Sequence, residues 1–286
     1  MIKNILVAID FSKCSINALE HAINIGNKAA ANIVMVWVNR PDYSKDIFID
    51  LSANIVDEVE NRFKALIEKY AKIFKHKLNY KIKTGKIYSE IVDEAEKSNA
   101  SIIITGTHGS SGFEKFWLGS NAYKIVMSTT LPVITIPASS QIAVNLSKIV
   151  LPIDSTPETR QKIIFTGIIA GLFKAKVFVL AVNSSKSESV IGRVRKYANQ
   201  VIEYFKEEDI EFDLTTVDAE NVTQASIQYA TKIEANLISI MTEQEKSTAN
   251  ILLGPYASQM INTSPIPVLC IHPKILSETI SHKKSL

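Results

Sequence analysis

A glycine-rich segment of this chain has the composition and spacing of a phosphate-binding loop. Two residues separate Gly106 from Gly109, nine residues separate Gly109 from Gly119, and Ser120 follows. The apolar run 101–105 predicts a buried strand before it, and helical periodicity begins after it. Glycine lets a backbone approach a bulky anion, and a helix start directs unpaired N–H groups and a positive dipole end at such a ligand. An ordinary strand-to-helix turn is the alternative, but the whole spacing, placed between strand and helix, favours a phosphate site.

The chain contains two copies of one sequence pattern. Four apolar segments recur: 5–12 in 149–156, 34–39 in 178–183, 100–105 in 235–240 and 131–136 in 266–271. The first two pairs are 144 residues apart and the last two are 135 apart, so the second copy lacks nine residues, most simply from its second helix. A chain of 286 residues is expected to hold about two domains, and self-similarity predicts two copies of one fold. We expect domains at 1–138 and 148–273, a small polar linker between them, and a polar tail at 274–286.

Each copy alternates apolar β-branched runs with amphipathic stretches, which is the βαβ pattern of an α/β fold. This pattern predicts a mostly parallel sheet with helices on both faces. In the first copy we expect strands at 4–9, 33–39, 78–84, 101–105 and 132–136. We expect helices at 14–30, 51–74, 87–98 and 120–128. Ser12 is a candidate cap of the first helix, and Ser89 or a nearby residue is a candidate cap of the third.

The two copies differ in the glycine-rich loop. Four positions align: Gly106 with Met241, Gly109 with Gln244, Gly119 with Gly254 and Ser120 with Pro255. Met and Gln add side chains where a backbone would approach phosphate, and Pro255 removes an N–H from the helix start. Glu243 and Glu245 add negative charge, while Asp154 and Asn183 retain part of a pocket. We therefore expect the second copy to lack this mode of triphosphate binding and to serve as a structural partner of the first.

The glycine spacing and the strands around it resemble the ATP-binding branch of the universal stress protein family. Segment 4–12 is similar to that family's first strand, which ends in an acidic residue followed by a serine. Segments 33–39 and 131–137 resemble its second and last strands. The resemblance implies two tandem Rossmann-like domains of the adenine nucleotide alpha hydrolase-like type. Each would have a five-stranded parallel sheet of order 3-2-1-4-5 with helices on both faces.

The resemblance also implies a ligand and its binding residues. The ligand would be ATP, with Mg²⁺ or Mn²⁺ as the accompanying ion and no assigned metal ligands. The base and ribose would be held by Ala8, Ile9, Asp10 and Val38. The phosphates would be surrounded by Thr105, Gly106, His108, Gly109, Gly119, Ser120 and Asn121. His108 could act through its side chain or its backbone alone, and Asp10 could contact the nucleotide, help hold a divalent ion, or cap a helix.

Two classes of function fit these residues, a binding module and an enzyme. Phosphoryl transfer needs a metal clamp and a residue that orients the nucleophile. The sequence has no Gly-x4-Gly-Lys-Ser/Thr loop and no kinase signature set, and only His108 and Asp10 are candidates for a base. We expect an ATP-binding stress-response or signalling module without catalytic residues. A slow ATPase or phosphoryl-transfer enzyme is the alternative, and the intact first loop disfavours a pair of ligand-free scaffolds.

The composition excludes several other classes. A formal charge of +3 over 286 residues is too small to indicate a nucleic-acid or membrane surface. No apolar run approaches the ~20 residues of a membrane helix, and a strand begins at once, so we expect no secretion signal and a cytoplasmic protein. Cys14 and Cys270 have no metal-type spacing and are expected to be plain apolar residues. His21, His76 and His272 also lack metal spacing and are expected at surfaces or edges.

The last strand of each copy, at 132–136 and 267–271, is short and apolar. In the order 3-2-1-4-5 this strand lies at the edge of the sheet, where exposed apolar backbone invites pairing. Family members commonly pair through it, so the resemblance implies that the two copies pair within one chain. A homodimer of whole chains and an unidentified protein partner are further expectations that the sequence does not fix.

Overall fold

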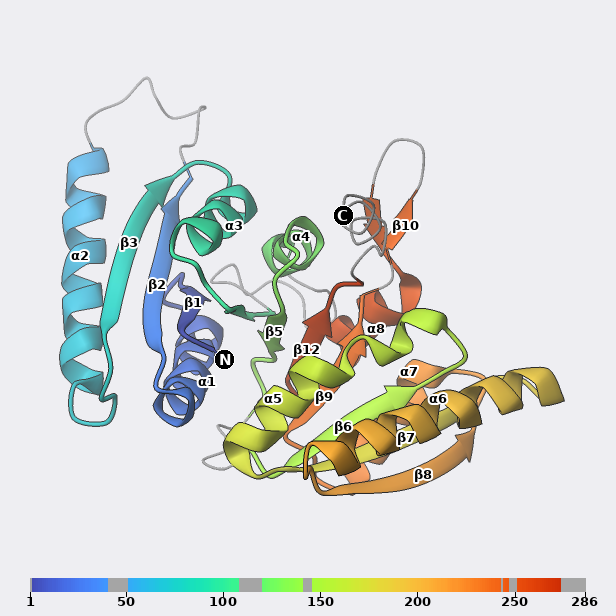
Figure 1. The fold of residues 1–286 in the computed structure, drawn as a ribbon. Helices are drawn as coiled ribbons and strands as arrows, with labels where there is room; N and C mark the ends of the chain where they lie inside the picture. The colour runs from blue at the N-terminus through green and yellow to red at the C-terminus, as the bar shows by residue number, and fades with distance from the viewer. Residues whose placement is uncertain are drawn as a thin grey trace, which may run out of the picture.

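The fold is one continuous sheet with helices packed on both faces (Figure 1). The computed structural model describes residues 2–40, 51–107, 120–140, 146–242, 244–246 and 251–273. The N-terminal half contributes strands β1 (Asn4–Ala8), β2 (Asn32–Asn39), β3 (Leu78–Thr84), β4 (Ile102–Gly106) and β5 (Val133–Ile136). The C-terminal half contributes β6 (Lys148–Ile153), β7 (Lys176–Asn183), β8 (Phe212–Asp218), β9 (Leu237–Met241) and β12 (Val268–Ile271).

The strand order joins the two halves at their last strands. It runs β3-β2-β1-β4-β5-β12-β9-β6-β7-β8, so each half has the expected order 3-2-1-4-5. Neighbouring strands within each half are parallel, whereas β5 and β12 are antiparallel, with Ile134 opposite Leu269. The two five-stranded sheets therefore join into one ten-stranded sheet, as expected from pairing of the two copies through their last strands. The reason is that each apolar edge strand satisfies its backbone groups on the other.

The helices form two layers that cover opposite faces of the sheet. One layer consists of α1 (Lys13–Ala29), α2 (Leu51–Tyr70), α5 (Ile163–Phe173) and α6 (Glu188–Glu207), with a short 3₁₀ helix, η1, at Pro157–Arg160. The other consists of α3 (Ile87–Lys97), α4 (Ser120–Ser128), α7 (Val222–Lys232) and α8 (Pro255–Thr263). Each layer buries an apolar stripe, exemplified by Phe63 and Phe205 on one face and by Met260 on the other. Strands buried on both faces explain the continuous apolar runs in the sequence.

Element positions in the N-terminal half follow the sequence closely. Each of its strands lies within one residue of the expected bounds. Ser12 caps α1, because its hydroxyl accepts a hydrogen bond from the Ser15 N–H at 3.2 Å. The expectation that Ser89 caps the third helix is wrong. That helix begins at Ile87, after Lys86, so Ser89 already lies inside it.

The nine residues missing from the second copy are not taken from a helix, contrary to our expectation. Helices α2 and α6 each have 20 residues. The connection before α6 has four residues (184–187) against eleven (40–50) before α2, and the connection after it has four (208–211) against seven (71–77). The connection between β8 and α7 is one residue longer than its counterpart, which gives the net loss of nine. Connections tolerate such changes because they carry few packed side chains.

Two of the three histidines expected at surfaces or edges are buried. His21 on α1 is 8% exposed and His272 after β12 is 7% exposed. Burial lowers the pKa of each imidazole to about 4, because desolvation disfavours the charged form. Cys14 and Cys270 are buried free thiols, as expected. In the part of the chain that the structure describes, no helix is long and apolar enough to cross a membrane.

Candidate functional site

The described candidate residues of the N-terminal half gather at one edge of the sheet. Strand β1 lies between β2 and β4, and all three are parallel, so their carboxyl ends adjoin. Ala8 ends β1, and the Ile9 N–H donates to the Val36 carbonyl oxygen of β2 at 2.8 Å. Four other members of the set also lie at or just beyond these strand ends: Asp10, Val38, Thr105 and Gly106. This edge, where the strand order reverses, is where open α/β sheets bind ligands.

Asp10 shapes the turn between β1 and α1. Its Oδ1 accepts a hydrogen bond from the Ser12 N–H at 2.9 Å, and Phe11 between them has a φ of 61°. An Asp side chain that accepts from a backbone N–H two residues on is a common device for such turns. Ser12, not Asp10, is the helix cap. Asp10 therefore has a structural role at the site edge, whatever ligand it contacts.

Gly106 is needed for packing as well as for any approach of a ligand. A Cβ atom at this position would lie 2.7 Å from the Cys14 Sγ and 3.1 Å from the Cys14 carbonyl carbon. The Cys14 thiol in turn donates to the Ile136 carbonyl oxygen at 3.2 Å. The first turn of α1 is thus pressed against the ends of β4 and β5. Sequence reasoning assigned Gly106 to phosphate contact alone and missed this requirement.

The rest of the glycine-rich loop ends where the sequence predicted a helix. Helix α4 begins at Ser120, and Asn121 lies exposed in its first turn. The helix packs against α3, and its buried residues belong to the same apolar cluster as residues of β4 and β5. His108, Gly109 and Gly119 lie outside the described residues. Their proposed roles rest on the spacing of the loop.

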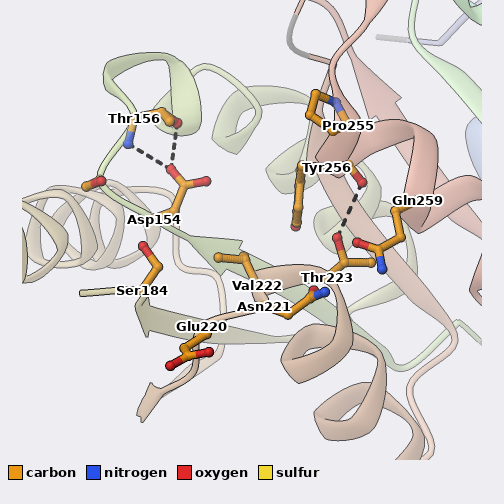
Figure 2. A pocket seen from close by; sticks show the side chains of 11 residues that line it. Asp154, Thr156, Ser184, Glu220, Asn221, Val222, Thr223, Pro255, Tyr256 and Gln259 are labelled. Atoms are coloured by element: carbon orange, nitrogen blue, oxygen red, sulfur yellow. Dashed lines mark hydrogen bonds between the residues drawn. The ribbon is translucent and has the colours of Figure 1, made fainter. Parts of the chain in front are cut away.

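The C-terminal half has a described cavity at the equivalent edge of its own strands (Figure 2). Its volume is about 320 Å³. The walls come from the residues after β6 and β7 and from the first turns of α7 and α8. The polar lining consists of Asp154, Ser155, Thr156, Ser184, Glu220, Asn221, Thr223, Tyr256 and Gln259. Figure 2 shows Asp154, Ser184 and Glu220 along one side and Pro255, Tyr256 and Gln259 on the other.

When the two copies are aligned in sequence, the positions that line this cavity differ in charge from their counterparts in the N-terminal half. Three neutral wall positions align with basic residues in the N-terminal half: Ser184 with Arg40, Asn221 with Lys86 and Gln259 with Lys124. The first pair follows β7 and β2, the second pair caps α7 and α3, and the third lies in α8 and α4. Asp154 aligns with Asp10. At these aligned positions the N-terminal half therefore has three cations and one carboxylate, whereas the described lining of the C-terminal cavity has two carboxylates, Asp154 and Glu220.

The three cations of the N-terminal edge, Arg40, Lys86 and Lys124, are exposed. Within the described residues none of them forms an ion pair, and the Lys124 ammonium lies 5.5 Å from the centre of the Tyr88 ring. Long cations without carboxylate partners at a strand-end edge are suited to contact an anion. Sequence reasoning missed all three. An alignment of the two copies could have identified them, because the residues at the same three positions of the second copy are neutral.

The second copy also replaces the glycine-rich loop with regular structure. Strands β10 (Gln244–Lys246) and β11 (Ile251–Leu253) form an antiparallel hairpin, which the sequence did not predict. Backbone groups that pair in this ladder are not available to a ligand. Helix α8 begins with Pro255 after Gly254, as the alignment indicated. Strand β11 also contacts α4 of the N-terminal half.

Comparisons with known proteins agree with this architecture. The family model described as the universal stress protein family matches residues 1–137 and 145–272. Universal stress protein A homolog 1 of Coxiella burnetii is 30% identical over 138 residues, covering 47% of this chain and 95% of that protein. Universal stress protein YxiE of Bacillus subtilis is 28% identical over 147 residues, covering 48% of this chain and 99% of that protein.

Solved structures show the same fold along the whole chain. A universal stress protein from Archaeoglobus fulgidus has a TM-score of 0.73 at 18% identity, covering 95% of this chain and 98% of that chain. A structure titled as a putative universal stress protein from Pseudomonas aeruginosa has a TM-score of 0.69 at 19% identity, covering 95% and 94%. Two family matches together span nearly all of the sequence. The chain therefore belongs to the universal stress protein family and carries the family's domain twice in tandem.

Proposed function

We propose that this chain is an ATP-binding stress-response or signalling module with one nucleotide site, in its N-terminal half. The main support for this proposal is the spacing of the glycines and the serine in residues 106–120. This segment lies between the buried strand β4 and helix α4, which starts at Ser120. The nearby Arg40, Lys86 and Lys124 support the proposal, because a triphosphate needs compensating positive charge. The C-terminal half then has a structural or regulatory role. The chain would act in the cytoplasm, through a homodimer or a protein partner.

The proposed contacts divide between the two ends of the nucleotide. Base and ribose would lie against the ends of β1 and β2, at Ala8, Ile9, Asp10 and Val38. The phosphates would lie among the loop and the start of α4, at Thr105, Gly106, His108, Gly109, Gly119, Ser120 and Asn121. The helix start supplies unpaired N–H groups and the positive end of a dipole. Asp10 is the carboxylate placed to meet a Mg²⁺ or Mn²⁺ ion that accompanies the phosphates.

We favour a binding role over catalysis, because His108 and Asp10 are the only candidate bases that the sequence offers. Asp10 is engaged in the turn before α1 through its contact with the Ser12 N–H. A slow ATPase is the alternative, and incubating the purified chain with ATP and Mg²⁺ and following phosphate release tests it.

Substitutions in the loop test the proposed site. Gly109→Val and Gly119→Val should place side-chain bulk where the phosphates lie, so ATP affinity should fall at least about tenfold, which corresponds to roughly 1.4 kcal/mol. Isothermal titration calorimetry of the full chain measures this. Gly192→Val is the matched control, because a Cβ atom at that exposed position meets nothing within 4 Å. Unaltered affinity in folded loop variants would place the nucleotide elsewhere.

A further inference from the structure

The C-terminal cavity occupies the position of the proposed nucleotide site but has the opposite charge. Asp154 and Glu220 line it, and its described lining contains no Lys, Arg or His. At the equivalent positions the N-terminal half has Asp10 and the three cations. A polyanion that suits one edge is repelled by the other. This contrast holds whether or not the N-terminal half binds ATP.

We propose that the C-terminal cavity is a second ligand site, which binds a small organic cation and rejects nucleotides. The ligand would carry a protonated amine or guanidinium group on an uncharged body with hydrogen-bonding groups. The two carboxylates select the positive charge, and the hydroxyl and amide side chains of the walls contact the uncharged body. The site would give the second copy a function of its own, beyond covering the edge of the first.

Asp154 has an oxygen available for such a ligand. The Thr156 N–H and hydroxyl donate to it at 2.8 and 2.6 Å, and both bonds go to Oδ1. Within the described residues, Oδ2 of Asp154 makes no protein hydrogen bond, and the carboxylate has no ion-pair partner. The carboxylate is therefore held in one orientation by the turn while its second oxygen can accept from a cation (Figure 2). A charge-assisted bond of this kind is about twice as strong as a neutral one.

Glu220 is placed at the cavity by an inserted residue. The N-terminal half connects β3 to α3 with Gly85 and Lys86, whereas the C-terminal half uses three residues, 219–221, between β8 and α7. Both connections end in the helix cap, so the insertion adds an acidic side chain next to the capping position. Glu220 is exposed at the cavity and forms no ion pair with any described residue. Together with the neutral residues that replace Arg40, Lys86 and Lys124, the insertion makes the lining of the C-terminal cavity acidic.

The helix starts at the cavity do not reverse this preference. A helix N-terminus acts as roughly half a positive charge, which favours anions. In α7 the Asn221 side chain already accepts from the Gln224 N–H at 2.9 Å. In α8 the first residue is Pro255, which has no N–H to offer. Two full carboxylate charges therefore outweigh two partial and weakened helix charges.

The size and walls of the cavity fit a small amphipathic cation. A volume of about 320 Å³ is at the lower end of the range for small-molecule sites. Val222, Pro255 and Tyr256 supply apolar surface, and Figure 2 shows Tyr256 across the cavity from Asp154. An aromatic ring opposite a carboxylate is a favourable setting for an aromatic amine, which can stack and donate at once. Gln259 and Ser184 add hydrogen-bonding groups at the two sides.

A matched series of probes tests the charge preference on the full chain. Tyramine, 4-hydroxyphenylacetamide and 4-hydroxyphenylacetate share one ring and differ in charge, and ligand-observed NMR titration at pH 7.5 gives their affinities. We expect tyramine to bind, the amide to bind about tenfold more weakly, and the acetate not to bind. Asp154→Asn should weaken tyramine binding about tenfold while keeping the Thr156 contacts. The more exposed Glu220→Gln should weaken it about threefold.

The controls separate this site from general attraction to acidic surface. Glu203→Gln removes an exposed carboxylate on α6, outside the cavity, and should leave tyramine binding unchanged. Saturating ATP should not displace tyramine. The proposal is overturned if tyramine does not bind, if the acetate binds equally well, if all three carboxylate variants behave alike, or if ATP competes.

Discussion

Three single-residue exchanges separate the two strand-end edges of this protein. Arg40, Lys86 and Lys124 stand where the second copy has Ser184, Asn221 and Gln259, on the same elements of the same fold. The elements that carry these three positions correspond in the two halves, so at these positions the halves differ in side-chain charge. The two halves can therefore be compared directly, because the same three positions are basic in the N-terminal half and neutral in the C-terminal half.

Replacing each cation by its counterpart should weaken nucleotide binding. In the triple variant Arg40→Ser, Lys86→Asn and Lys124→Gln, ATP affinity should fall at least about tenfold at low salt, because three exposed charges act on a polyanion. The loss should shrink at high salt, where screening already weakens these contacts. Calorimetric titration at two salt concentrations measures both effects. The control removes the same charge from exposed positions elsewhere, with Lys196→Gln, Lys206→Gln and Lys232→Gln, and an equal loss there would contradict the assignment.

Gly106 should be essential for stability independently of any ligand. Gly106→Ala should destabilise the fold by about 1–3 kcal/mol, because the added Cβ atom overlaps the Cys14 Sγ and approaches the α1 backbone. Adding Cys14→Ala removes the Sγ contact and should recover part of the loss in urea denaturation. Gly171→Ala, whose Cβ atom would meet nothing within 4 Å, should not destabilise the protein. Additive effects of the Gly106 and Cys14 changes would show that the two residues do not press on each other.

The role of a residue could be predicted from the sequence where it depends on neighbouring residues in the chain, but not where it depends on packing between distant elements. The capping role of Ser12 could be predicted because a cap involves only neighbouring residues. The packing demand at Gly106 and the burial of His21 depend on helices and strands far away in sequence. The cations were missed for the same reason, since only the strand order brings their positions to one edge. An alignment of the two copies, position by position, would have been the available signal.

At the scale of elements, we expect the pairing of β5 with β12 to be the main interaction that holds the two halves together. A fragment of residues 1–138 exposes β5, so it should self-associate through that strand, and sedimentation or light scattering gives its mass. Ile134 is 2% exposed and lies opposite Leu269 in the seam, so Ile134→Lys should suppress the association by burying a charge. Ile73→Lys is the control, because Ile73 is 56% exposed. A fragment that stays monomeric at high concentration would contradict this explanation.

The strands could be predicted from sequence better than the connections between them. Runs buried on both faces leave a continuous apolar signal, and each strand of the N-terminal half lies within one residue of its expected bounds. The hairpin of β10 and β11 gave no such signal, since its two strands have three residues each. We expected the nine missing residues to come from a helix, although they are missing from connections. Comparing the spacing of the two copies shows only that the segment between their second and fourth strands is shorter, not which part of it is shorter.

For the whole molecule, the buried histidines predict a loss of stability in mild acid. Their pKa values are near 4 in the folded protein and near 6.5 when unfolded, so both are neutral above pH 6.5 and stability is then fully present. As the pH falls from 6.5 towards 4, only the unfolded chain takes up these protons, which costs about 2 kcal/mol per histidine by pH 5.

Urea denaturation at pH 7.5 and pH 5.0 measures this dependence. His21→Phe copies Phe165, the aligned residue of α5, and should reduce the loss between the two pH values by up to about 2 kcal/mol. His76→Gln is the control, because His76 is only partly buried. Equal pH dependence in wild-type protein and His21→Phe would show that the imidazole of His21 can be protonated in the folded state.

The central claim for the whole molecule is functional asymmetry between two copies of one fold. Calorimetric titration of the full chain with ATP tests it most directly, because it returns affinity and stoichiometry together. The account predicts one ATP per chain, with affinity lowered at least about tenfold by Gly119→Val in the N-terminal loop and retained after Asp154→Asn in the C-terminal cavity. A stoichiometry of two, no binding at all, or loss of binding in Asp154→Asn would contradict it.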